Sequence, residues 1–346
     1  VDNGTQFGFY LLAYPWHALL SNLTPPDAAL LRLLPAFFSI ATIPLIYLLT
    51  RESLQGLGLR SHYARALPLL ATALFAASPA AVQYAQEFRS YSMQLFFLAL
   101  ASLIALRAAH EKIDRYWWVG YGLTAAGALY AHGLSAIFLV VQAGALLLGA
   151  GRLRGRIIIE LAKSGLLAAL LTLPLSLTLL EHGPSPMHWI LPLAASRVIS
   201  AVGRLLGAAG ATVSPATGSG PTVPLQDPFM LVLAAIPALI GCALLARRWG
   251  KRPTAVALLL LPLLAVPLIV AVLSLLGTRL WVARYLLVLL LPLIVVTALG
   301  LAVLAKWSRD QLQRRCYPTA TFGLFLLLAG LFIPLAHLLG DIGWVS

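Results

Sequence analysis

Residues 255–276 read AVALLLLPLLAVPLIVAVLSLL, an apolar stretch without a single charged side chain. A helix of about 20 such residues crosses the roughly 30 Å hydrocarbon layer of a bilayer. Inside lipid no water is available to satisfy backbone N–H and C=O groups, so the stretch must be helical. The sequence therefore predicts a membrane-spanning helix here, and the rest of the chain decides how many others accompany it.

The same pattern recurs along the chain. The stretches long enough to be spans cover residues 29–50, 67–84, 91–108, 116–131, 134–150, 157–180, 229–246, 255–276, 282–305 and 320–339. Of the 346 residues, 60% are hydrophobic and 10% are charged, and the mean hydropathy is +0.91. Soluble domains carry roughly 25% charged residues, so this composition excludes a water-soluble fold. We expect an all-α, polytopic transmembrane bundle of about ten spans.

The net charge of +13 would suggest a nucleic-acid partner if the cations shared one soluble face. Instead, most Lys and Arg residues fall in alternate connections, at residues 51–65, 107–115, 152–156, 247–252 and 306–315. Cytoplasmic loops of membrane proteins are enriched in these residues. The distribution of charge therefore indicates membrane topology, and we expect no nucleic-acid partner. It predicts that the other connections lie on the extracytoplasmic side of a cell (inner) membrane.

Two further segments fit the outer membrane surface. Residues 7–23 combine leucines with aromatic side chains and are expected to form an interfacial or re-entrant helix. The outer loop contains a mixed apolar and Arg pattern at residues 196–208, followed by a Gly- and Pro-rich stretch. The predicted organisation is an outer segment 1–28, a six-span core 29–180, an outer loop 181–228 and four C-terminal spans in 229–346.

Ionisable side chains at membrane depth are costly, so those on the outer side mark a candidate site. The densest group is QEFRSY at residues 86–91. Glu87 could orient a sugar hydroxyl or hold a metal, and Arg89 could bind a phosphate through two hydrogen bonds. If the stretch is helical, Glu87 and Tyr91 share a face. The alternative is a polar turn whose charges contact headgroups or one another.

Other outer residues allow the same two interpretations. Arg279 and Arg284 lie beside interfacial aromatic residues, Tyr285 among them, which suits a lipid phosphate and is equally usual for a membrane anchor. His132 ends one predicted span, and Arg32 lies near the outer end of another. Each is either a site residue or an ordinary helix-end residue. Cys242 and Cys316 provide neither a disulfide framework nor metal-ligand spacing.

Taken in order, several stretches resemble the polytopic glycosyltransferases of the GT-C superfamily that use polyprenyl-phosphate sugar donors. The similarity is to the protein mannosyltransferase and aminoarabinose transferase type, like glycosyltransferase family 39. The similar stretches are FYLLAYPW at 9–16, ALLRLLPAFFSIATIPLIYLLTRE at 29–52, SP at 78–79, QEFRSY at 86–91, LYAH at 129–132, and RY at 284–285 followed by Pro292. Together they cover most of the chain up to about residue 304.

The resemblance implies an enzyme that moves a sugar, with inversion, from a polyprenyl-phosphate donor to an extracytoplasmic protein, lipid or glycan. That family carries its catalytic acid in a first outer loop, ahead of the matching region, so the chain is expected to be N-terminally truncated relative to it. Asp2 aligns with an acidic residue that precedes the family's His-Pro-Pro motif.

The catalytic residues expected from this comparison are Glu87 and Asp2. The substrate-binding residues expected are Arg32, Arg89, Tyr91, His132, Arg279, Arg284 and Tyr285. No cofactor is required, although Glu87 could hold a divalent metal. The expected partners are the lipid-linked donor, membrane lipids and the acceptor. A transporter or flippase of a lipid-linked substrate, and an inactive GT-C-like fragment, are the alternatives.

Overall fold

The part of the chain that the structure describes is built from helices. The computed structural model describes residues 7–21, 28–59, 63–110, 115–182, 190, 192–208, 228–314 and 316–342. The α-helices are α1 (Phe7–Ser21), α2 (Ala28–Gly56), α3 (Tyr63–Ala76), α4 (Pro79–Gln86), α5 (Tyr91–His110), α6 (Arg115–Ala131), α7 (Ser135–Gly149), α8 (Arg154–Leu171), α9 (Leu173–His182), α10 (Ala195–Leu205), α11 (Pro228–Ala246), α12 (Pro253–Leu273), α13 (Leu290–Gln313) and α14 (Tyr317–Ile342). Shorter helical turns are η1 (Gly151–Leu153), η2 (Ser274–Thr278) and η3 (Ala283–Leu289).

These helices confirm an all-α fold suited to a membrane. Among the described residues, five helices are long and apolar enough to cross a bilayer: Ala29–Gly56, Tyr91–Ala108, Phe229–Ala246, Pro253–Thr278 and Ala283–Gln313. The number rises to seven if each of two bent helix pairs is one span. The expected count of about ten spans is not confirmed. One reason is that α6, with 17 residues, is shorter than the usual span of about 20.

One of the two bent pairs interrupts a stretch that the hydropathy pattern shows as continuous, residues 67–84, and the other bends at the basic connection between the stretches 134–150 and 157–180. Helices α3 and α4 meet at 51°, and α7 meets the η1–α8 helix at 118°. The first bend has a local cause, because Ser78 caps α4 and Pro79 fills its first turn, where a missing N–H costs nothing. Because of this bend, α4, which carries part of the candidate site, runs in a different direction from α3.

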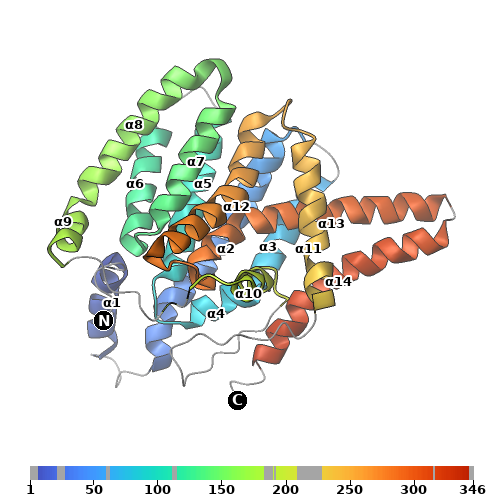
Figure 1. The fold of residues 1–346 in the computed structure, drawn as a ribbon, viewed down its shortest axis with the longest axis horizontal. Helices are drawn as coiled ribbons and strands as arrows, with labels where there is room; N and C mark the ends of the chain where they lie inside the picture. Colours follow the sequence, from blue (N-terminus) through green and yellow to red (C-terminus); the bar gives the residue numbers. More distant parts are fainter. Residues whose placement is uncertain are drawn as a thin grey trace.

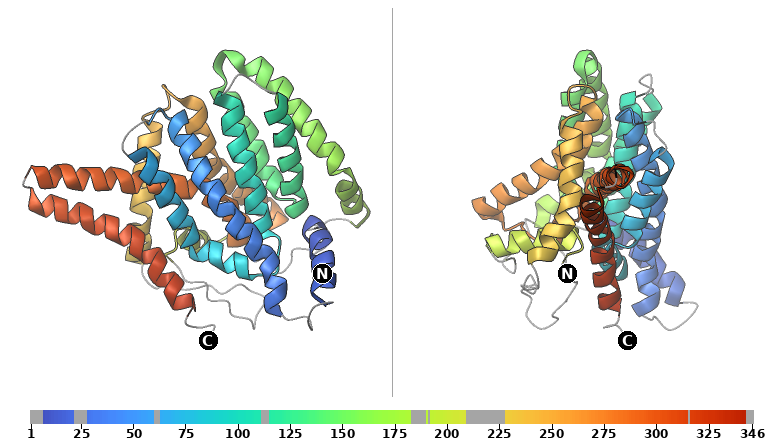
Figure 2. Two further views of the ribbon diagram at one scale, coloured as in Figure 1. Left: turned by 180° about the vertical axis from the view of Figure 1, so that it is seen from behind. Right: turned by 90° about the vertical axis from the view of Figure 1, so that its right-hand side faces the viewer.

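The core joins helices that are far apart in the sequence (Figures 1 and 2). Ile46 of α2, Leu98 of α5 and Val295 of α13 are completely buried in one cluster. That cluster includes residues from both the 29–180 and the 229–346 segments. By contrast, leucines on the outer face of α12 are exposed; Leu264, for example, is 68% exposed. Exposed leucines are expected where acyl chains, and not water, surround the helices.

Helices α11, α13 and α14 pack closely because each has a glycine at its contact with a neighbouring helix. A Cβ atom at Gly300 of α13 would overlap the carbonyl oxygen of Pro237 on α11, and one at Gly241 would overlap the carbonyl of Val296. Gly330 of α14 faces the Pro237 ring, where a Cβ would lie 2.9 Å from its Cγ. Small residues let backbones approach in membrane bundles, where helix association depends on close packing.

Buried polar side chains of the interior find partners across helix interfaces. Gln94 of α5 donates to Ser135 Oγ of α7 at 3.0 Å, and Ser135 donates to the carbonyl of Ala128 at 2.8 Å. Further along the same pair of helices, Gln142 donates to Ser102 Oγ at 2.8 Å. Such bonds replace those that water cannot make inside a bilayer.

Basic connections meet at one end of the bundle. The α7–α8 and α11–α12 connections lie together at the top of Figure 1, whereas α1, α4 and α10 lie toward the bottom. Arg248 donates to the carbonyl of Leu57 at 3.0 Å, which adds the α2–α3 turn to the same end. The α13–α14 connection departs from this pattern, because it projects to the side of the bundle (Figure 1).

Candidate functional site

The site begins at the turn between α4 and α5. Glu87 follows the last residue of α4 with an extended backbone (φ −85°, ψ 127°), so the helix stops there. Its carboxylate accepts a hydrogen bond from Gln83 Nε2 at 3.2 Å, one helical turn earlier. The expectation that Glu87 and Tyr91 share a helical face is therefore wrong, since Tyr91 begins a separate helix, α5. The local break directs Glu87 toward α4.

Helix α1 holds this turn from the outside. The buried ring of Phe9 packs edge to face on Phe88, with the ring centroids 5.3 Å apart. Phe88 lies between the two charged residues of the turn, so the packing positions both. Residues 7–23 were expected to form a helix, and α1 spans Phe7–Ser21.

Three arginines from separate parts of the chain interact electrostatically with Glu87: Arg89 of the turn, Arg204 of α10 and Arg284 of η3. Burial raises the pKa of the Glu87 carboxyl above its ordinary value of 4.5, and the Gln83 hydrogen bond and the three arginines only partly oppose that rise. Glu87 and Arg284, both expected in the site from the sequence, therefore belong to the same charged group. A buried carboxyl beside guanidinium groups is typical of a functional site.

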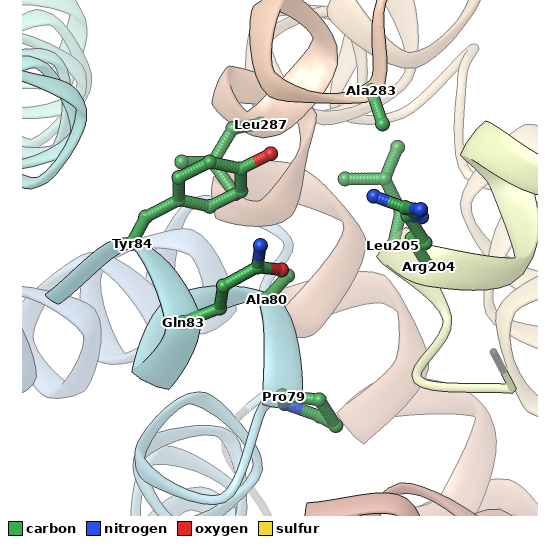
Figure 3. Close-up of a pocket in the computed structure, with 8 residues that line it drawn as sticks. All are labelled: Pro79, Ala80, Gln83, Tyr84, Arg204, Leu205, Ala283 and Leu287. Atoms are coloured by element: carbon green, nitrogen blue, oxygen red, sulfur yellow. The ribbon is translucent and has the colours of Figure 1, made fainter. Parts of the chain in front are cut away.

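A small recess opens beside this group. Its lining residues are Pro79, Ala80, Gln83, Tyr84, Arg204, Leu205, Ala283 and Leu287. Figure 3 shows the polar ends of Gln83, Tyr84 and Arg204 pointing toward one another across the recess. Arg204 Nε is buried and has no hydrogen-bond partner among the described residues. A buried guanidinium nitrogen with no partner is costly, and an anion in the recess would relieve that cost.

Arg204 is a residue of the candidate site that the motif analysis missed. A signal was present, since Arg197 and Arg204 are seven residues apart and seven residues make about two helical turns, so they lie on one side of α10. The sequence alone does not show where α10 packs. In the structure it packs against η3 and α4. Trp281 Nε1 also donates to the carbonyl of Arg197 at 3.4 Å.

A shallow, largely apolar groove adjoins the recess. Its lining residues are Leu74, Ser78, Pro79, Leu205, Leu206, Gly207, Ala234, Leu290, Leu293, Ile294, Thr297 and Gly330. Pro79 and Leu205 line both hollows. A cationic pocket therefore adjoins a largely apolar groove.

An aromatic chain supports the site from within. Tyr91 packs on Tyr84 at 5.2 Å between ring centroids, stacks on His132 at 5.7 Å, and His132 meets the Tyr285 ring edge at 5.4 Å. The Arg284 guanidinium lies 5.8 Å from the Tyr285 ring. The structure thus brings together four residues predicted for substrate binding, namely Tyr91, His132, Arg284 and Tyr285. Tyr91 and His132 are 1% and 3% exposed and line neither hollow, so their contacts position other side chains.

Among the described residues, none of the predicted site residues lines the recess itself. Arg279 caps η2 with a left-handed backbone (φ 49°), and Arg32 is an exposed residue near the start of α2. Asp2 lies outside the described residues. Within the described ranges, no group of three or more His, Cys, Asp or Glu side chains could hold a metal ion.

No protein-family model matches the sequence, and no curated protein matches it either.

Proposed function

We propose that this chain is a membrane glycosyltransferase of the GT-C type that transfers a sugar from a polyprenyl-phosphate donor to an extracytoplasmic acceptor. The single observation that carries the proposal is the cationic recess and its adjoining apolar groove, with Pro79 and Leu205 common to both. A polyprenyl phosphate has the matching chemistry, an anionic head on an apolar chain. The resemblance of the motifs in the sequence supports the same class, and this type implies a bundle of about ten spans, of which the described residues show five to seven candidates.

In the proposed complex, the phosphate lies near Arg204 and Arg284 and the isoprenoid chain follows the groove. Guanidinium groups bind phosphate oxygens in pairs and keep their charge at any working pH. As the bond between the anomeric carbon and the phosphate oxygen breaks, the leaving phosphate gains negative charge. Cations already placed there would stabilise it most in the transition state.

Glu87 has the complementary role of general base or sugar-orienting carboxylate. As a base it accepts the proton of the acceptor hydroxyl, whose oxygen then attacks the anomeric carbon on the face opposite the phosphate. A raised pKa favours this role, because a general base works best when its pKa is near the operating pH. Asp2 is the second proposed carboxylate.

The test uses the full chain in lipid nanodiscs with a radiolabelled polyprenyl-phosphate sugar. We expect donor binding and transfer or hydrolysis of the sugar. Arg204→Gln should weaken donor binding about tenfold or more, the usual effect of losing a hydrogen bond to a charged group. Arg197→Gln is the matched control, because it removes the same charge from the same helix outside the recess.

Equal losses in the two variants would contradict the recess as the phosphate site. Movement of the labelled lipid across a vesicle membrane, without any sugar released or transferred, would favour a flippase. Failure of the wild type to bind the donor would overturn the proposal.

A further inference from the structure

A second cationic surface lies at the other end of the bundle, at the turn between α11 and α12. Its cations are Arg247, Arg248, Lys251 and Arg252. Trp249 lies among them and is 43% exposed. The Nη1 atom of Arg248 donates to the carbonyl of Leu57 at 3.0 Å. We call these five residues the basic turn.

The α2–α3 turn holds the basic turn in place. Gly58 has a left-handed backbone (φ 68°), and its missing side chain leaves room for the Arg252 guanidinium, which lies 3.3 Å from where a Cβ would be. Thr254, just after the basic turn, donates to the carbonyl of Gly149 at 2.8 Å. This bond brings the exposed Arg152 and Arg154 of the α7–α8 connection close by.

The charge of the basic turn is not balanced by the described acidic residues. In the described ranges the ion pairs are Arg107–Glu52 at 3.2 Å and Lys163–Glu160 at 3.0 Å. Neither includes a residue of the basic turn. Clustered like charges repel one another, so an anion bound between them lowers the energy of the folded protein.

We propose that the basic turn binds the phosphate of an anionic phospholipid. The turn joins two apolar helices that are each long enough to cross a bilayer, which places its cations near the depth of the headgroups. Tryptophan is enriched at that depth, and basic clusters beside membrane helices bind acidic headgroups. The inference does not depend on the proposed glycosyltransferase activity, because this surface lies at the opposite end from the recess (Figure 1).

The test measures binding of phosphatidylglycerol brominated on its acyl chains to the full chain in nanodiscs of phosphatidylcholine. Bromine quenches nearby tryptophans, and the Trp249→Phe variant identifies the part of the signal that comes from the basic turn. Arg247→Gln/Lys251→Gln removes two exposed cations and should lower the apparent affinity about thirtyfold, since each cation near the surface contributes about 1 kcal/mol. Lys306→Gln/Arg314→Gln, which removes the same charge from the C-terminal part of α13 and its cap, should leave the Trp249 signal unchanged.

Thermal unfolding of each variant separates loss of binding from loss of fold. Three results would overturn the proposal: equal quenching by brominated phosphatidylcholine, equal losses in the two double variants, or no Trp249 signal. Displacement of the lipid by millimolar inorganic phosphate would also overturn it, because the surface would then recognise phosphate without the lipid.

Discussion

Replacement of Gly300 by alanine tests the packing that forms one side of the apolar groove. Gly300 faces Pro237 of α11, and Pro237 also faces Gly330 of α14, a residue of the groove lining. A methyl group at Gly300 would overlap the Pro237 carbonyl oxygen, which belongs to a helix backbone and cannot rotate away. We therefore expect α11 and α13 to separate slightly and the groove to change shape.

The size of the effect follows from two opposing contributions. Alanine in place of glycine inside a helix usually stabilises by up to about 1 kcal/mol. Overpacking usually costs about 1–3 kcal/mol, and a rigid backbone obstacle favours the upper end. Gly300→Ala should therefore lose about 2 kcal/mol net. The control is Gly165→Ala in α8, where a Cβ meets nothing within 4 Å, and it should gain about 0.5–1 kcal/mol.

The assay is thermal unfolding of both variants in the same detergent, followed by binding of a polyprenyl phosphate. Gly300→Ala should melt at lower temperature than the wild type and bind the lipid more weakly, whereas Gly165→Ala should melt higher and bind normally. If Gly300→Ala is as stable as Gly165→Ala, the close approach of α11 and α13 is refuted.

Three further predictions concern polar groups. Because burial raises the pKa of Glu87, the folded protein keeps a proton there that the unfolded chain releases above pH 4.5. The stability of the wild type should therefore fall, relative to that of Glu87→Gln, as the pH rises above 4.5. A pH-independent difference between the two proteins would contradict this. Ser135→Ala leaves the Gln94 amide without its acceptor and should cost about 1–3 kcal/mol in thermal unfolding, with partial recovery in Gln94→Leu/Ser135→Ala. Glu52→Gln weakens a pair with Arg107 in which the two side chains are 21% and 28% exposed; it should cost about 1 kcal/mol by the same measurement, and a loss well above that would contradict the modest value expected of a partly exposed pair.

Much of the fold could be predicted from hydropathy, because lipid leaves the backbone little choice but helix. Stretches such as 229–246 and 255–276 correspond to α11 and α12. The breaks were harder to predict. The stretch 67–84 is evenly apolar, yet Ser78 and Pro79 begin a new helix within it, and hydropathy averages over such capping residues.

The candidate site was predictable only where a local motif marks its residues. Glu87 and Arg89 share one short turn, so the motif located them directly. Arg284 was predicted from its aromatic neighbours. Gln83 lay within an expected span, and Arg204 reaches the recess through the docking of α10, which depends on contacts between segments far apart in the chain.

The first turn of α4 has a consequence for how an anion would be recognised. Free N–H groups at the start of a helix commonly attract phosphates. At this point Pro79 has no N–H to offer, and the Ala81 N–H already points at Ser78 Oγ, 3.4 Å away. The boundary between the two hollows is thus poor in backbone donors, and selectivity for a negative headgroup falls to guanidinium side chains, which single substitutions can remove one at a time.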